Sequence, residues 1–144
     1  DLHHSEILPI YTSLNVFYST CAPMFLSNST ERALGALFLF YRLNGVSYED
    51  AKSLFLQKEE RDDISTFVYS QYYGNLGETM PDELLYSFIE KYKYFLAMPL
   101  DKIIKINDIS YVVWDKKNNP GWELDQYQFL SKIYEEGDFI IYKN

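Results

Sequence analysis

The sequence predicts a small layered α/β fold, in which a central sheet of about three to four strands ends in a C-terminal β-hairpin and is covered by four to five helices. Three observations lead to this fold class. Apolar residues recur at helical spacing through most of the first hundred residues. Residues 108–115 are β-branched and aromatic on both faces, as in a strand buried between two layers. Near the end, residues 133–134 and 139–142 flank Glu135-Glu136-Gly137-Asp138, a turn suited to a hairpin.

The size and composition of the chain predict one α/β domain over residues 1–144. Apolar residues make up 47% and charged residues 24%, which is near the globular average. The aromatic share is 18%, with 14 Tyr and 10 Phe, and a compositional habit explains it more simply than a binding surface. No apolar run approaches the roughly 20 residues that span a bilayer, and no signal peptide is recognisable. We therefore expect either a cytoplasmic protein or a soluble piece of a larger one.

The charge balance and the scarce metal-binding residues narrow the function classes. The net charge is −8, from 21 acidic and 13 basic residues without a basic cluster, which argues against a nucleic-acid partner. The single cysteine, Cys21, excludes an internal disulfide and a multi-cysteine zinc site. His3 and His4 stand at the start of the chain and receive no metal role. The sequence thus predicts neither a metal site nor a cofactor.

The local patterns predict five helices preceded by one strand. A strand is expected at residues 16–20, bounded by Pro23. The helices are expected after a choice of N-caps at residues 27–31, from residue 47, over residues 64–73, after residues 79–83 and from residue 99. Asn28 and Glu31 are spaced as in a capping box, and Asn44-Gly45 ends the first helix. Residues 108–115 then form the central strand that the helices cover, followed by a polar loop and one helical turn within residues 125–130.

The sequence contains no recognisable catalytic motif. A His-dependent triad is close to excluded because His3 and His4 are the only histidines. Adjacent acids such as Glu49-Asp50 belong to helix starts and turns, where the helix dipole and solvent explain them. Asp115 is the exception, because it ends the expected buried strand, where open α/β sheets bind ligands. Its commoner role there is to cap the following turn, and whether the chain is an enzyme stays open.

An aromatic group after the central strand is the other candidate ligand surface. Trp114, Trp122, Tyr127 and Phe129 can form a platform of the kind that stacks on sugars or bases, and with Asp115 the first three are the possible ligand surface. Pro120-Gly121 lies between the two tryptophans, so the same rings can instead anchor a long loop to the sheet. Anchoring is the interpretation that we favour.

Both ends of the chain resemble one class of membrane protein. At the start, the matching segments are Leu8-Pro9-Ile10-Tyr11-Thr12, Asn15-Val16-Phe17-Tyr18, Glu31-Arg32 and Leu43-Asn44-Gly45-Val46-Ser47. At the end, they are Ile109-Ser110-Tyr111-Val112-Val113-Trp114 and residues 130–142. These segments resemble the C-terminal extracytoplasmic domain of bacterial polytopic membrane proteins of the GT-C glycosyltransferase-like class.

The resemblance implies a function without implying an active site. In that class the catalytic acids lie in loops near the membrane spans, so no catalytic residue carries over to this chain. Related domains open with a strand just before the equivalent of His4, so the resemblance implies that this chain begins part-way into its domain. The expected function is a non-catalytic extracytoplasmic soluble domain in cell-surface glycan assembly, whose partners are the membrane-embedded remainder of the parent and a glycan. The alternative is a free-standing carbohydrate- or protein-binding module that uses the surface around Trp114 and Trp122, with a cytoplasmic location as the alternative to an extracytoplasmic one.

Overall fold

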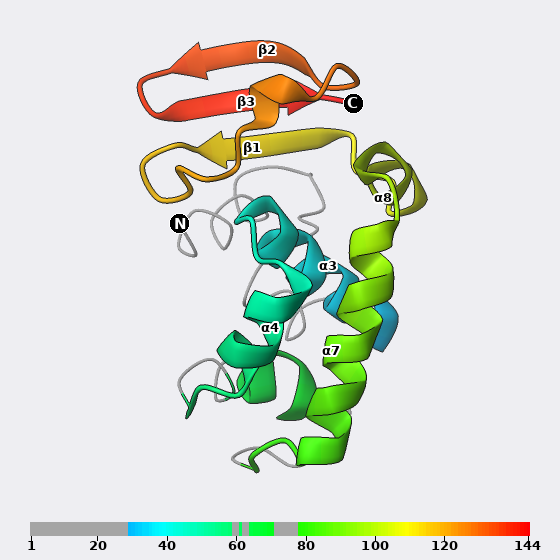
Figure 1. Ribbon diagram of the computed structural model, residues 1–144. Coiled ribbons are helices and arrows are strands. Elements are labelled where there is room, and N and C mark those ends of the chain that lie inside the picture. The colour runs from blue at the N-terminus through cyan, green and yellow to red at the C-terminus, as the bar shows by residue number, and fades with distance from the viewer. Residues whose placement is uncertain (1–28, 59–60, 62–63, 71–77) are drawn as a thin grey trace.

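The computed structural model describes residues 29–58, 61, 64–70 and 78–144 (Figure 1). Within these residues the order of elements is α3 (Thr30–Leu43), α4 (Tyr48–Phe55), η1 (Ser65–Tyr69), α7 (Asp82–Ala97), α8 (Leu100–Ile106), β1 (Tyr111–Asp115), η2 (Leu124–Gln126), β2 (Ser131–Glu136) and β3 (Phe139–Lys143). The predicted α/β class, with its strands at the C-terminal end, is confirmed. The expected strand at residues 16–20 lies outside the described residues, as do His3, His4 and Cys21. None of the described helices is both long and apolar enough to cross a membrane.

The three strands form an antiparallel sheet in the order β1-β3-β2. The prediction that residues 108–115 form the central, doubly buried strand is therefore wrong, because among the described strands β1 is at an edge and β3 is in the middle. Along β1, Trp114 is only 7% exposed, whereas Tyr111 and Val113 on the opposite face are 43% and 41% exposed. Apolar residues on both faces suggested two covering layers, but the Tyr111 and Val113 face of this strand is exposed and, within the described structure, only the Trp114 face is buried.

The predicted hairpin is confirmed, with strands slightly longer than expected. Glu136 pairs with Phe139, so the connecting turn consists of Gly137 and Asp138 alone. Gly137 has φ +58°, and a positive φ at the first turn residue only is the requirement of a type II′ turn. The pairing of β2 with β3 shifts between Lys132 and Tyr134, which leaves Ile133 as a β-bulge.

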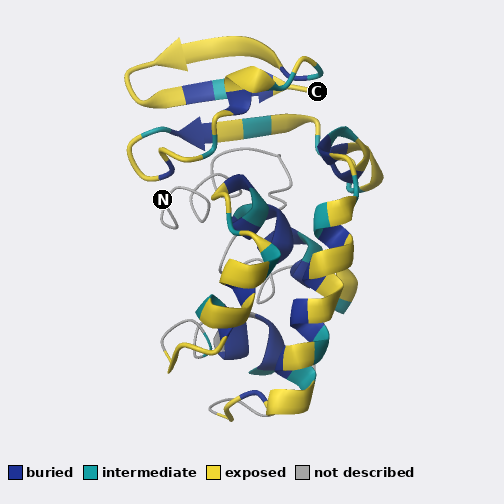
Figure 2. Ribbon diagram, viewed as in Figure 1, coloured by how far each residue is buried: buried dark blue, intermediate teal, exposed yellow. Residues whose placement is uncertain are grey.

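The helices α3, α4 and α7 pack beside one another below the sheet, and α8 leads from α7 to β1 (Figure 1). Their buried sides face one another (Figure 2). At their centre the ring of Tyr92 lies 5.3 Å from Phe38 and 6.1 Å from Phe55, measured between ring centroids. Tyr41 completes the group at 5.0 Å from Phe55. The tyrosines and phenylalanines of this aromatic core thus join all three helices in one apolar cluster.

The N-caps of α3 and α4 lie in the segments where the sequence predicts them, but the capping residue of α3 differs from the predicted one. The N-cap of α3 is Ser29, whose side chain accepts from the Arg32 N–H at 3.2 Å. Asn28, the residue placed in the predicted capping box, lies outside the described residues. In α4, Ser47 and Asp50 form a reciprocal capping box, and the hydrogen bonds from Ser47 lower the pKa of Asp50.

The helix predicted over residues 64–73 is described only as far as Ser70, and its centre is a π-helical segment. The Ser70 N–H donates to the Ser65 carbonyl, five residues back. The Ser65 hydroxyl also accepts from the N–H of the fully buried Met80 at 3.1 Å. In addition, Arg61 contacts Asp82 at 2.7 Å. Side chains before and within η1 therefore fix the segment that starts α7, which no local pattern in the sequence indicates.

The end of α3 has the hydrogen-bond pattern of a Schellman motif. The Val46 N–H donates to the Tyr41 carbonyl at 3.0 Å, and the Gly45 N–H donates to the Arg42 carbonyl at 3.0 Å. Gly45 has φ +75°, the left-handed conformation that glycine adopts most easily. The predicted stop at Asn44-Gly45 therefore has a physical basis.

The end of α8 repeats this motif without a glycine. The Ile109 N–H donates to the Ile104 carbonyl at 3.0 Å, and the Asp108 N–H donates to the Lys105 carbonyl at 3.1 Å. Asp108 holds the left-handed position with φ +52°. A residue with a Cβ is strained in this conformation, so the turn that delivers the chain to β1 is less stable than its counterpart after α3.

Replacing the two residues at the left-handed positions should have opposite effects. Gly45→Ala should lower the free energy of unfolding by about 1 kcal/mol or more, because a Cβ there has no neighbour within 4 Å and the cost is conformational. Asp108→Gly should raise it by about 0.5 kcal/mol through relief of strain. Urea unfolding of the two variants beside the natural chain measures both effects, and a shift in the same direction for both would contradict this account.

Candidate functional site

Trp114 and Asp115 lie together at the end of β1, where both side chains close the following turn. The Trp114 indole N–H donates to the Asn119 carbonyl at 2.7 Å. The Asp115 Oδ1 atom accepts from the backbone N–H groups of Lys117 at 3.1 Å and Asn118 at 3.2 Å, and Oδ2 accepts from the Asn118 side chain at 2.7 Å. Asp115 itself is buried. All of these contacts are internal to the turn and serve its structure.

The pKa of Asp115 is lowered despite its burial. Burial favours the neutral acid, but the hydrogen bonds from the side chain and N–H of Asn118 and from the N–H of Lys117 outweigh it. Asp115 is therefore a carboxylate at neutral pH. A general acid needs a raised pKa, so this environment suits a turn cap and does not suit a proton donor.

Trp122 and Tyr127 are half-buried and lie farther along the same loop. The Trp122 ring meets Phe40 of α3 edge-on at 6.3 Å between centroids. Tyr127 packs against Phe129 at 5.7 Å. Because Trp114 is buried, the predicted set of Trp114, Asp115, Trp122 and Tyr127 does not present one exposed aromatic platform. Trp122 thus contacts helix α3, whereas the sequence led us to expect this loop to be anchored on the sheet.

A polar network that the sequence did not reveal connects this loop to the hairpin. The Tyr142 hydroxyl donates to Asp125 of η2 at 2.8 Å, and Lys132 of β2 contacts the same carboxylate at 3.2 Å. Lys132 also contacts Glu135 at 3.1 Å, and Lys116 contacts Glu135 at 2.9 Å. These residues are separated by up to 26 positions in the sequence, from 116 to 142, so only tertiary structure places them together.

The pKa of Asp125 is lowered, first by the hydrogen bond from Tyr142 and then by Lys132. A carboxyl group with a lowered folded pKa stabilises the fold above its unfolded pKa of about 3.9, and this contribution is lost as the pH falls through the folded value. We expect Tyr142→Phe to remove the larger cause and to make the urea midpoint less sensitive to acid below about pH 4. Urea titrations at neutral and acid pH measure this, and an unchanged acid sensitivity would contradict the assignment.

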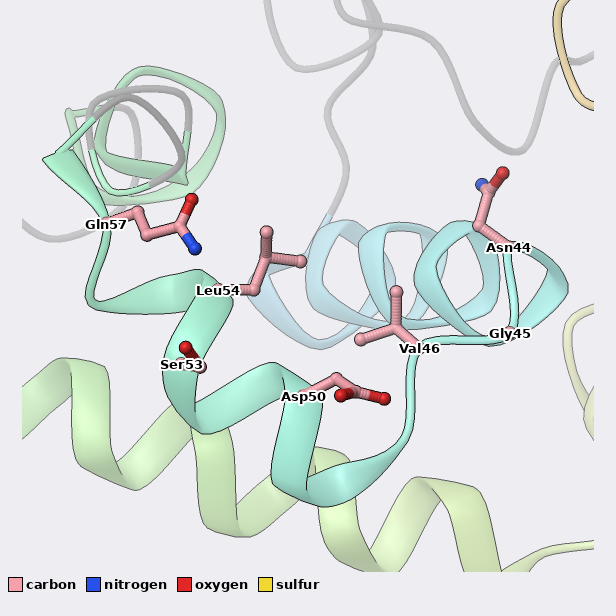
Figure 3. Close-up of a pocket in the computed structure, with 7 residues that line it drawn as sticks. All are labelled: Asn44, Gly45, Val46, Asp50, Ser53, Leu54 and Gln57. Atoms are coloured by element: carbon pink, nitrogen blue, oxygen red, sulfur yellow. The ribbon is translucent and has the colours of Figure 1, made fainter.

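A hollow of about 380 Å³ lies at the turn between α3 and α4 (Figure 3). It is lined by Asn44, Gly45, Val46, Asp50, Ser53, Leu54 and Gln57. Its main polar groups are already engaged, because Asp50 accepts from Ser47 and the Asn44 amide donates to the Phe40 carbonyl at 2.8 Å. The hollow therefore lies where the C-terminal cap of α3 meets the N-terminal cap of α4. The sequence indicates its position only through the residues of these two caps.

One face of the sheet carries an exposed apolar row. The register places Val113, Ile141 and Tyr134 side by side across β1, β3 and β2. Tyr134 is 47% exposed and Val113 is 41% exposed, while Ile141 between them is half-buried. We call these three residues the outer row. The alternation of apolar and polar residues does not predict the outer row, because the row depends on which strands are neighbours in the sheet.

Within the described residues, no three His, Cys, Asp or Glu side chains lie close enough to hold a metal ion. The sequence matches no family model, and it is significantly similar to no curated protein and to no solved structure. A function must therefore be inferred from the described residues and from the resemblance at the two ends of the chain.

Proposed function

We propose that this chain is a non-catalytic domain that acts by contact with another protein. The observation that supports this most directly is the outer row, because apolar side chains gathered at a surface are typical of interaction sites. The chemistry of the acids agrees with it. The pKa values of Asp50, Asp115, Asp125 and Glu135 are all lowered by hydrogen bonds or ion pairs, so none of the four is suited to donate a proton at neutral pH.

The resemblance at both ends of the chain supports a parent protein of the GT-C-like membrane class. We propose that the domain faces the outside of a bacterial membrane and belongs to a GT-C-like protein of cell-surface glycan assembly. Its partner is the membrane-embedded remainder of that protein, which handles the glycan. The outer row supplies an apolar contact for such a partner, and the net charge of −8 argues against nucleic acid in its place.

Reading the DNA upstream of the Asp1 codon tests the proposed parent. We expect the open reading frame to continue upstream and to encode several apolar segments of about 20 residues each. A start codon close to residue 1, with no such segments before it, would contradict the proposal.

The contact surface is tested with the detergent-solubilised membrane part of the parent and the full chain added separately. Val113→Lys places a charge in the outer row and should weaken binding by about tenfold or more. Tyr94→Lys is the matched control, because it places the same charge on a residue of α7 that is 73% exposed. Equal binding by the Val113→Lys chain would exclude the outer row as the contact.

A carbohydrate-binding module is a second candidate, favoured by one observation on Trp122. Its side chain is half-buried, so part of the ring is exposed for a sugar to stack on. If a glycan stacks there, the tryptophan emission should change. Trp122→Phe should abolish that change while the buried Trp114 keeps its own emission. Unchanged emission across a glycan panel would exclude this module.

A further inference from the structure

Strand β2 is an edge of the sheet, and all six of its residues are exposed. Hydrogen bonds elsewhere in the sheet show which of its backbone groups point outward. The Lys116 N–H donates to the Asp138 carbonyl at 2.9 Å, and the Asn144 N–H donates to the Ser110 carbonyl at 3.0 Å. These two bonds lie just beyond the end pairs of β1 and β3, which are Tyr111 with Lys143 and Asp115 with Phe139. Hydrogen-bonded and non-hydrogen-bonded pairs alternate along an antiparallel ladder, so the backbone groups of these two end pairs do not bond each other.

The backbone groups of β3 consequently alternate between its two neighbours. The N–H and C=O groups of Ile140 and Tyr142 point toward β1. The N–H and C=O groups of Phe139, Ile141 and Lys143 point toward β2. The residues of β2 that pair with Ile140 and Tyr142 are Glu135 and Lys132. The N–H and C=O groups of Glu135 and Lys132 therefore point away from the sheet, and no other described segment bonds to them.

Strand β2 of a second chain, related by a two-fold axis, can form hydrogen bonds with these outward N–H and C=O groups in three registers. Lys132 can face Lys132 of a second chain, Glu135 can face Glu135, or Lys132 and Glu135 can face each other. The first two registers oppose like charges and pair only one outward residue per chain. The third pairs both outward residues of both chains and sets opposite charges across the junction twice.

We propose that β2 pairs with β2 of a second copy of this chain, antiparallel about a two-fold axis between Ile133 and Tyr134. The pairing gives a continuous sheet of six strands in the order β1-β3-β2-β2-β3-β1. In this register Ile133 faces Tyr134 of the other copy, an aliphatic and aromatic cross-strand pair. The outer rows of both copies then lie in one sheet. This inference does not depend on the proposed function.

The local charges support this register. Each Lys132 contacts its own Asp125 and Glu135, so it already lies in an acidic setting, and the same setting raises its pKa. Two copies at −8 each repel at long range, but salt at physiological strength screens charges beyond about 8 Å. One six-residue strand buries less surface than a standard protein interface, so the dimer should be weak and reversible.

Sedimentation equilibrium of the full chain between micromolar and near-millimolar concentration tests the dimer. The natural chain should pass from monomer to dimer over this range. Lys132→Glu and Glu135→Lys should each weaken dimerisation by about tenfold or more, because each opposes like charges twice. An equimolar mixture of the two variants should form heterodimers, since every Glu of one chain then faces a Lys of the other.

Three outcomes would overturn the proposal. The natural chain could stay monomeric at near-millimolar concentration, the mixed variants could fail to associate, or Val113→Lys could abolish a dimer that Lys132→Glu leaves intact. The last would place the junction on the outer row and away from the β2 edge. Circular dichroism verifies that each variant is folded. If Lys132→Glu is unfolded because of the nearby Asp125, then Lys132→Gln, which should weaken the dimer less, replaces it in the homodimer measurement.

Discussion

Tyr92→Ala should lower the free energy of unfolding by about 4 kcal/mol, the largest effect expected of a single substitution in this chain. Tyr92 is fully buried, and its ring packs against Phe38, Tyr41 and Phe55. Its hydroxyl donates to the Val46 carbonyl at 2.7 Å, so one side chain joins three helices and the turn between two of them. Urea unfolding followed by far-ultraviolet circular dichroism measures the loss.

Two substitutions separate the contributions of the Tyr92 ring and hydroxyl. Tyr92→Phe keeps the ring and leaves the Val46 carbonyl without its donor, which should cost about 1–2 kcal/mol. Burial raises the pKa of Tyr92, so the hydroxyl is protonated and remains a donor at neutral pH. Tyr94→Ala, two residues along the same helix, is the exposed control and should change stability by less than about 0.5 kcal/mol. Similar losses at Tyr92 and Tyr94 would refute the three-helix core.

Asp115→Ala should lower the free energy of unfolding by about 2 kcal/mol. The carboxylate accepts two backbone N–H groups in the turn after β1, and both lose their acceptor in the alanine variant. Asp115→Asn keeps an oxygen for those two groups and should cost less than about 1 kcal/mol. Because Trp114 closes the same turn, its fluorescence reports the loss along the urea titration.

The pH dependence provides an independent check on Asp115. Its folded pKa is lowered, so the carboxylate stabilises the fold above the unfolded pKa of about 3.9, and that contribution is lost as the pH falls through the folded value. Asp115→Asn should therefore lose less stability than the natural chain between about pH 5 and about pH 2. If the natural chain and Asp115→Asn lost stability equally over this range, the role of Asp115 as a cap would be wrong.

The elements with local signals were the predictable part of this fold. Ser47 and Asp50 appear in the sequence as a helix start and form a capping box in the structure. Asn44-Gly45 appears as a helix stop and has the positive φ that such a stop requires. Gly137 likewise marks the hairpin turn. In each case the deciding interactions span five residues or fewer, so the local sequence contains the information.

The candidate site was predictable only in part. The simpler role considered for Asp115, a cap of the next turn, agrees with its hydrogen bonds to residues two and three positions ahead. The polar network of Asp125, Lys132 and Tyr142 had no signal, because its members meet only after the hairpin packs on the loop. The outer row was missed for a related reason, since it consists of one residue from each strand.

The sequence by itself determined the start of α4, the end of α3, the hairpin and the mixed α/β class, because caps, turn glycines and apolar spacing act over one or two helical turns or one strand. Tertiary structure alone decided the strand order. Residues 108–115 carry apolar side chains on both faces, which fits a central strand, yet β3 takes that place because it pairs with both β1 and β2. Which face of β1 is covered, and which backbone groups of β2 remain unpaired, depend on that long-range pairing and not on the residues of either strand.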